Sequence, residues 1–193
     1  MLIESLLTDS EPMYVGIAEV QNIKHLSKDE LVQQSNLQTD NILAIQFLNA
    51  TLVASPLHLI SATQNALNAH TGNYALARSL DIEILVYASL QHQIGRALEI
   101  MGVTDNQKVV GIVVVGSNSE TIRKQIDSII SSIGIELDPP FAPDESTINK
   151  IARAFDIKQS ELDLLDFGES IESRRDALTR LIVSRVSMVA LDA

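Results

Sequence analysis

An unbroken aliphatic run, KVVGIVVV at residues 108–115, constrains the fold more than any other feature of this sequence. The run is rich in β-branched valine, which favours strands. A strand with no polar position along it must be covered on both of its faces. We therefore predict a central strand here, fully buried within a sheet.

Further strands and helices are predicted around this strand. Residues 13–20 and 42–50 are short apolar segments bounded by polar residues, as strands are, and 51–53 extends the second. Ser27 and Glu30 have the spacing of a helix capping box, and Ser55–Pro56 is a typical helix start. The helices are predicted at 27–35, 56–71, 119–133 (after a Ser117 or Asn118 cap), about 144–155, about 160–166 and 171–191.

The segment 79–102 allows two interpretations. Residues 82–87 have the β-branched bias of a buried strand. The apolar residues from Ile84 to Met101, however, recur at steps of three and four, which is the period of a helix. We expect one continuous helix that ends at Gly102.

Short strands separated by groups of helices predict an α+β fold: a compact two-layer sandwich with a small central sheet, helices mainly on one face and a long C-terminal helix. The 193 residues suit a single domain.

Within this domain, residues 136–170 hold nine acidic and three basic side chains, and the proline-rich linker DPPFAP lies near their start, at 138–143. We predict an acidic helical insertion there, forming a solvated appendage. Its segment 148–166 resembles a helix-turn-helix, but its acidic side chains would repel phosphates, which favours a structural helix pair.

The composition excludes several classes of function. The chain has no cysteine, so thiol catalysis and cysteine-bound metals are excluded. Its net charge of −11 argues against a broad duplex-DNA-binding face. The longest apolar stretch is too short to span a bilayer, and the first residues lack a basic leader region. The four histidines have no metal-ligand spacing, and no nucleophile motif is present. We expect a soluble, cytoplasmic protein without a cofactor, a metal or an active site.

Two polar segments are candidates for binding. Gly116 follows the central strand and precedes a helix, so the turn 115–119 could present free amides to an anion; an ordinary capped turn is the favoured interpretation. Residues 89–96 place polar side chains on a helix that otherwise packs hydrophobically. This segment suits recognition of a short single strand of RNA, or is a plain polar face.

The C-terminal arginines are expected to form solvated pairs with Glu172 and Asp176.

Beyond these patterns, the sequence resembles one known family. The resemblance is carried by Leu57-His58-Leu59, by Gly72-Asn73, by SLDIEILVYAS at 79–89, by Gln93-Ile94, by VVGIVVVG at 109–116 and by LTRLIVSRVSMVALD at 178–192. Their order and spacing are similar to those of the small regulatory subunit of the KEOPS (EKC) complex, the family of the PRPK-binding protein, in its archaeal type.

The resemblance implies a non-catalytic protein with a compact α+β fold. It implies binding to, and stimulation of, the small atypical kinase/ATPase of the complex, and indirect contact with the Kae-type transferase subunit. The complex forms threonylcarbamoyladenosine (t6A) at tRNA position 37, and family members help to hold the single-stranded 3′ CCA end of tRNA. The rival hypothesis is a small anion- or nucleotide-binding enzyme that uses the Gly116 turn. Neither DNA nor a membrane is expected as a partner.

Polarity and helical spacing then suggest the contact residues. We predict RNA contacts by Arg78, Ser89, His92, Gln93 and Arg96, and kinase contacts by an exposed apolar seam of Val186, Val189, Ala190 and Leu191. Many relatives carry a basic residue directly before the Gln-Ile pair. This chain has His92 there, which adds no charge at neutral pH and weakens the expected RNA contact.

Overall fold

The computed structural model describes residues 1–9, 11–35, 41–168 and 170–190. Its strands are β1 (Leu2–Leu6), β2 (Met13–Gln21), β3 (Ile42–Asn49), β4 (Val109–Gly116) and β5 (Ile135–Glu136). Its helices are α1 (Lys28–Ser35), α2 (Pro56–Thr71), α3 (Leu80–Ala88), α4 (Ile94–Met101), α5 (Ser119–Ile133), α6 (Glu145–Ala154), α7 (Gln159–Leu165) and α8 (Ile171–Val186), with a 3-10 turn, η1 (Ala50–Leu52).

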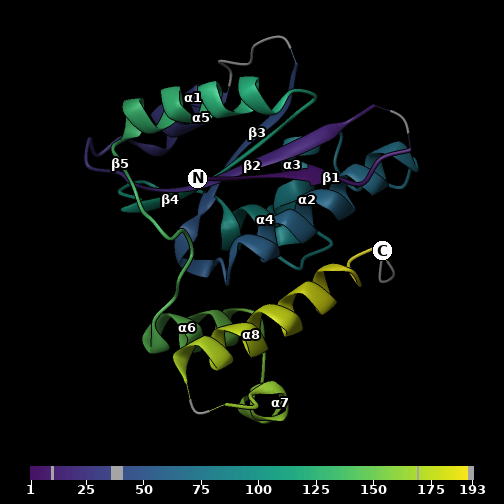
Figure 1. The fold of residues 1–193 in the computed structure, drawn as a ribbon, viewed down its shortest axis with the longest axis vertical. Coiled ribbons are helices and arrows are strands. Elements are labelled where there is room, and N and C mark those ends of the chain that lie inside the picture. The colour runs from purple at the N-terminus through teal and green to yellow at the C-terminus, as the bar shows by residue number, and fades with distance from the viewer. Residues whose placement is uncertain (10, 36–40, 169, 191–193) are drawn as a thin grey trace.

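The strands form an antiparallel sheet in the order β1-β2-β4-β3, with β5 also paired to β2 (Figure 1). The aliphatic run forms β4, which lies between β2 and β3. Every residue of β4 after Val109 is buried. The prediction of a central strand covered on both faces is confirmed.

Helices cover both faces of this sheet. α1 and α5 lie on one face, where Gly16 of β2 lacks the side chain that would collide with Ile122 and Ile126 of α5. The other helices lie on the opposite face, against a second buried cluster that includes Val113 and Val115 of β4. The α+β class is confirmed, with most of the helices on one face.

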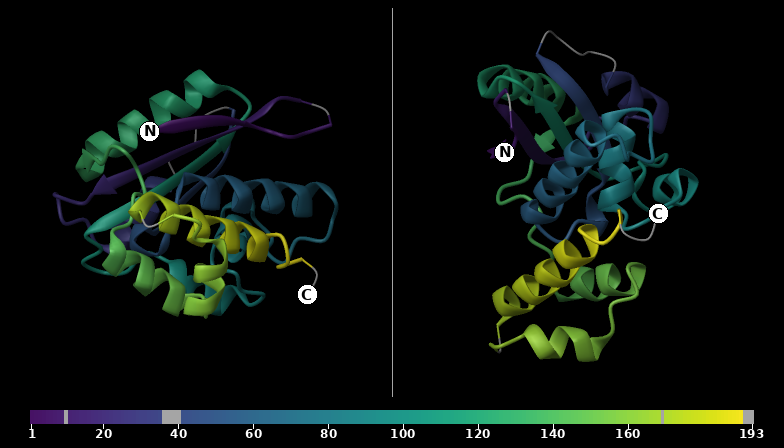
Figure 2. Two further views of the ribbon diagram at one scale, coloured as in Figure 1. Left: turned by 60° about the horizontal axis from the view of Figure 1, so that its bottom comes forward. Right: turned by 90° about the vertical axis from the view of Figure 1, so that its right-hand side faces the viewer.

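Helices α6 and α7 of the acidic segment 136–170 form a lower layer with α8 (Figure 1 and Figure 2). In Figure 1, α6, α7 and α8 lie together below the helices that cover the sheet. Phe141, Ile148, Ile151 and Leu162 of the acidic segment are buried in the same cluster as α2 and α3. The two short helices were predicted correctly, but the segment is not a solvated appendage, because its apolar side chains complete the core.

Three predicted elements differ from the structure. The segment 79–102 is two helices, α3 and α4, separated by a turn in which Leu90 has a φ of 56°. Residues 51–53 do not extend β3, because the Asn49 side chain accepts a hydrogen bond from the Thr51 amide and starts η1. The last helix ends at Val186 rather than at 191.

The predicted helix starts are confirmed by their side-chain caps. Ser27 and Glu30 exchange hydrogen bonds as a capping box before α1. Ser55 caps α2, whose first residue is Pro56. The Asn118 side chain caps α5, accepting a hydrogen bond of 2.9 Å from the Thr121 amide.

Candidate nucleic-acid and partner interface

A groove of about 380 Å³ lies between the α3–α4 turn and the end of α8. It brings together two stretches that were predicted separately, the polar segment after α3 and the apolar end of the last helix. The end of α6 forms its third side. The lining residues are Leu90, Gln91, His92, Ala154, Phe155, Asp156, Arg185, Met188 and Val189.

Backbone strain occurs on two sides of this groove. Leu90 and Asp156 have φ values of 56° and 51°, in the left-handed region that a bulky side chain such as leucine rarely adopts. Such conformations persist only where the surroundings enforce them, and they are frequent at functional sites. The turn that separates α3 from α4 leaves Leu90 and Gln91 half-buried and His92 and Gln93 exposed.

The buried side chain of His58, in α2, holds this turn in place. Its ring lies between two backbone groups, with Nδ1 3.4 Å from the Ala54 nitrogen and Nε2 2.9 Å from the Ala88 carbonyl oxygen. Burial lowers the pKa of His58 to about 4, so the ring is neutral at pH 7. It also meets Phe155 edge to face, with 5.9 Å between ring centroids. One histidine thus joins α2, α3 and the lower layer.

Three of the predicted RNA-contact residues lie together on the surface. His92 lines the groove, and Gln93 and Arg96 follow it at the start of α4, all three exposed. The Arg96 guanidinium forms an exposed ion pair of 2.6 Å with Glu99. Such a surface pair is weak, so a phosphate or base could replace the carboxylate. This cluster is the polar part of the candidate site.

The other two predicted RNA-contact residues lie elsewhere. Ser89 is buried, and its hydroxyl donates to the Val86 carbonyl oxygen at 2.8 Å, so the prediction that it contacts RNA is wrong for this conformation. Arg78 is exposed, but it lies before α3, whereas His92 lies after that helix. The loop of Arg78 is held by the buried carboxylate of Glu83, which accepts hydrogen bonds from the backbone amides of Leu76 and Ala77.

The predicted apolar seam at the end of the last helix is wrong for two of its members. Val186 and Val189 are 0% and 2% exposed, because they pack into the core of this chain itself. Ala190 is half-buried, and Leu191 lies outside the described residues. Met188, which the sequence did not single out, is 49% exposed and lines the groove.

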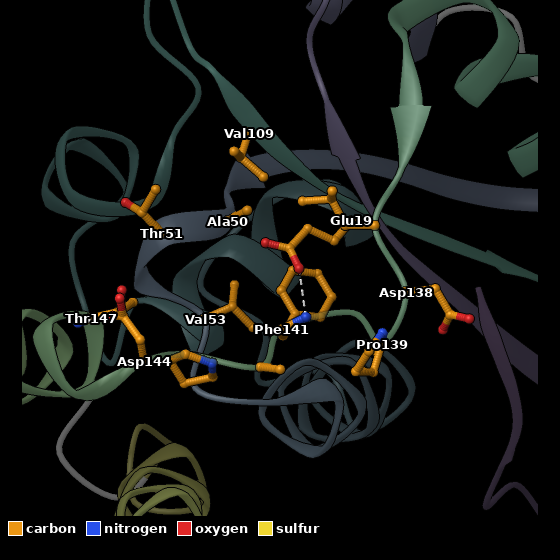
Figure 3. A pocket seen from close by; sticks show the side chains of 13 residues that line it. Glu19, Ala50, Thr51, Val53, Val109, Asp138, Pro139, Phe141, Asp144 and Thr147 are labelled. Carbon is orange, nitrogen blue, oxygen red and sulfur yellow. Dashed lines mark hydrogen bonds between the residues drawn. The ribbon is translucent and has the colours of Figure 1, made fainter. Parts of the chain in front are cut away.

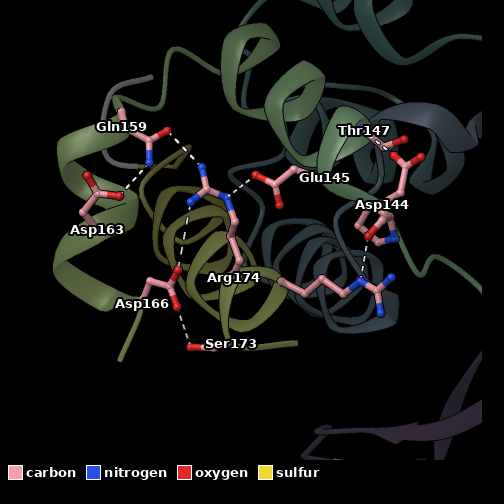
Figure 4. A network of polar contacts seen from close by, with 10 residues as sticks. Asp144, Glu145, Thr147, Gln159, Asp163, Asp166, Ser173 and Arg174 are labelled. Atoms are coloured by element: carbon pink, nitrogen blue, oxygen red, sulfur yellow. Dashed lines mark hydrogen bonds and ion pairs between the residues drawn. The ribbon is translucent and has the colours of Figure 1, made fainter. Parts of the chain in front are cut away.

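Three of the four arginines of α8 bind the acidic segment, and Figure 4 shows this for Arg174. Arg174 Nε lies 2.9 Å from Glu145 Oε1 of α6, and Arg185 Nη2 lies 2.9 Å from Glu161 Oε1 of α7. Arg175 Nε donates to the Pro143 carbonyl oxygen at 2.6 Å. In place of the expected solvated pairs with Glu172 and Asp176, these arginines form contacts that attach the acidic segment to α8.

The turn after Gly116 has the geometry of an ordinary capped helix start. The Asn118 side chain accepts a hydrogen bond from the Thr121 amide, as in an ordinary side-chain cap. A side chain at position 116 would collide with the Asn41 carbonyl oxygen, which explains the glycine without a ligand.

Over the described residues, no group of three or more histidine, aspartate or glutamate side chains could hold a metal ion. The helices of that same part of the chain include none long and apolar enough to cross a membrane.

Sequence patterns did not reveal the contributions of Glu83, Phe155 and Arg185 to the candidate site. All three act through backbone atoms or through residues distant in sequence, which helical or strand periodicity does not encode. The one available signal was a strongly acidic segment followed directly by four arginines, since opposite charges that are close in sequence often pair.

Comparison with known proteins gives a family match over most of the chain. Residues 17–190 match the family model described as "Kinase binding protein CGI-121". The chain is 29% identical over 115 residues to the "EKC/KEOPS complex subunit TPRKB" of Danio rerio, over 59% of this chain and 65% of that protein. It is 35% identical over 96 residues to the "Regulatory protein Cgi121" of Methanocaldococcus jannaschii, over 50% of this chain and 58% of that protein. These alignments span less than two thirds of either relative.

Proposed function

This chain belongs to the kinase binding protein CGI-121 family, and from that premise we propose that it is the kinase-binding regulatory subunit of a KEOPS-type complex. In this role it binds and stimulates the small atypical kinase/ATPase and catalyses no reaction by itself. The observation that carries the proposal is the extent of the family match, which includes the sheet except β1 and the start of β2, together with the groove and α8. The names of the two relatives support the same role.

The finer part of the proposal concerns tRNA. The groove and the exposed His92, Gln93 and Arg96 form a surface for the single-stranded 3′ CCA end. An imidazole can stack on a base, an amide can pair with a base edge, and a guanidinium can bind a phosphate. Few nucleotides are needed, so a chain of net charge −11 can make this contact while its partners supply the remaining attraction.

The kinase contact is proposed for the end of α8. Met188 is exposed there and Ala190 is half-buried, while Val186 and Val189 support this surface from the core. Through the kinase, the chain acts indirectly on the Kae-type transferase and on t6A formation. For this work on tRNA we propose a cytoplasmic location.

The proposal is tested with the purified chain, its cognate kinase and tRNA. ATP turnover by the kinase should rise when the chain is added, and tRNA should bind less well after its terminal CCA is removed. Arg96→Ala should weaken tRNA binding about tenfold and leave kinase stimulation unchanged. Arg180→Ala is the matched control, since Arg180 is an exposed arginine of α8 outside the groove.

Two results would overturn parts of this proposal. No change in ATP turnover with the cognate kinase would remove the regulatory role. Nucleotide binding by the isolated chain, lost on substitution at Asn118, would favour the anion-binding turn instead. If Arg96→Ala and CCA removal both leave tRNA affinity unchanged, the RNA contact does not lie in this groove.

A further inference from the structure

A second cavity, of about 480 Å³, lies between the sheet and the proline-rich linker (Figure 3). It is separate from the groove described above and shares no lining residue with it. Its apolar walls come from η1 and the residue after it, from β4 and from the chain around the linker: Ala50, Val53, Val109, Leu137, Pro139 and Phe141. Its polar lining consists of Glu19, Thr51, Asp138, Asp144 and Thr147. Nothing in the proposed kinase or RNA contacts uses it.

The main polar group in this cavity is the carboxylate of Glu19, on β2. In Figure 3 its carboxylate lies above Phe141 and Val53. One oxygen, Oε2, accepts a hydrogen bond of 2.6 Å from the Phe141 backbone nitrogen. Within the described ranges, Oε1 has no hydrogen bond and the carboxylate has no ion pair. Burial raises the pKa of Glu19, as expected for a carboxylate that lacks a cation.

The charged side chains nearby do not neutralise the negative charge of the Glu19 carboxylate. The Lys150 ammonium donates to the Thr51 hydroxyl at 2.7 Å, and the Arg175 guanidinium is bonded to the carbonyl oxygens of the linker. Asp144 caps α6 by accepting from the Thr147 amide, and the Asp138 side chain points away from the cavity in Figure 3. One half-buried carboxylate therefore faces a partly apolar cavity, with one oxygen that has no hydrogen-bond partner in the described part of the chain and no basic side chain among the lining residues.

We infer that this cavity binds a guanidinium or primary ammonium group carried on an apolar stem. The cation would donate charge-assisted hydrogen bonds to Oε1 of Glu19, in surroundings where such bonds are stronger than in water. The stem would pack against Val53, Val109 and Phe141. The same chemistry could come from a free small amine or from an arginine or lysine of a partner protein.

The free-amine source is tested by titrating the full chain with agmatine, which carries both cationic groups on a short alkyl stem. NMR shifts should appear at Val53, Val109 and Phe141. Glu19→Gln keeps an acceptor for the Phe141 amide, so it should fold normally, yet it should weaken binding at least tenfold. Glu4→Gln is the matched control, because it removes the same charge from an exposed position on β1 outside the cavity. Val109→Phe, which keeps the charge and fills the space, should also weaken binding.

The partner source is tested by measuring the affinity of the cognate kinase for the same variants. A tenfold loss with Glu19→Gln, without agmatine binding to the wild-type chain, assigns the cation to the kinase. The inference is overturned if Glu19→Gln changes neither agmatine binding nor kinase affinity. If the wild-type chain does not bind the kinase at all, the proposed function fails, and the agmatine titration alone decides this inference.

Discussion

The sheet body and the acidic segment 136–170 are stabilised by partly different means. The body is built around β4, whose aliphatic side chains are buried on both faces. The acidic segment contributes fewer buried side chains and is fastened by arginines of α8 that bind its carboxylates and its carbonyl oxygens. Hydrophobic burial thus stabilises both regions, and charged hydrogen bonds add a second means of attachment for the acidic segment. The two regions should respond differently to mutation, pH and salt.

One part of the joint between the two regions involves the buried histidine of α2. His58 of α2 meets Phe155 at the end of α6, and the Arg185 guanidinium binds the Phe155 carbonyl oxygen at 2.5 Å. The candidate groove lies at this joint. Changes that loosen the acidic segment should therefore alter the groove while the sheet remains folded.

The largest expected effect is the loss of an aliphatic side chain from the body. Ile112→Ala removes a fully buried side chain from β4 and leaves a cavity, which should lower the free energy of unfolding by about 2–5 kcal/mol. Leu164→Ala in α7 is the contrasting variant, since Leu164 is 74% exposed and should change stability by less than about 0.5 kcal/mol. Denaturant unfolding measures both. Similar costs for the two variants would contradict the comparison.

The next effect is the pH dependence caused by His58. Its pKa is about 4 in the folded chain and 6.5 when unperturbed, so the unfolded chain binds the extra proton first as the pH falls. Stability should be fully present above pH 6.5 and should decrease by up to about 3 kcal/mol as the pH falls to 4. His58→Gln should flatten this part of the curve, measured by unfolding at pH 7 and pH 4.5. An unchanged slope in His58→Gln would exclude His58 as the cause.

A smaller and more local effect is expected from Arg185. Arg185→Ala removes hydrogen bonds to the Phe155 carbonyl oxygen and to Glu161, at an expected cost of about 1.5–3 kcal/mol. Amide hydrogen exchange should become faster in 145–165 and stay unchanged in β4. Arg180→Ala, on the same helix but exposed, should leave both regions as they are. Faster exchange across the whole sheet would mean that the two regions do not separate energetically.

The sequence was sufficient for elements whose signals are local. The aliphatic run of β4, the Ser27–Glu30 capping box and the Ser55–Pro56 helix start each depend on neighbouring residues, and all were predicted correctly. The break between α3 and α4 was missed. Helical periodicity continues through Leu90, while the turn is held by His58, which is distant in sequence.

The candidate site was predicted only where exposure follows from polarity. His92, Gln93 and Arg96 are exposed as expected. Ser89 is buried although it is polar, because its hydroxyl bonds to the Val86 carbonyl oxygen, and Val189 is buried by packing in the core. The apolar residues at the end of α8 pack into the core of this same chain. An apolar helix end alone therefore does not distinguish a core contact from a docking surface.

The smallest effect, and the one that most sharpens the comparison, concerns Glu145. Its ion pair with Arg174 is 2.9 Å long, but the Glu145 side chain is 55% exposed, so water and salt weaken the pair. Glu145→Gln should cost only about 0.2–1 kcal/mol, and the difference from the wild type should shrink between 50 mM and about 1 M salt. Ile112→Ala should keep its full cost over the same range, because hydrophobic burial is not screened. A salt-independent cost for Glu145→Gln would mean that shape, rather than charge, fastens the acidic segment to α8.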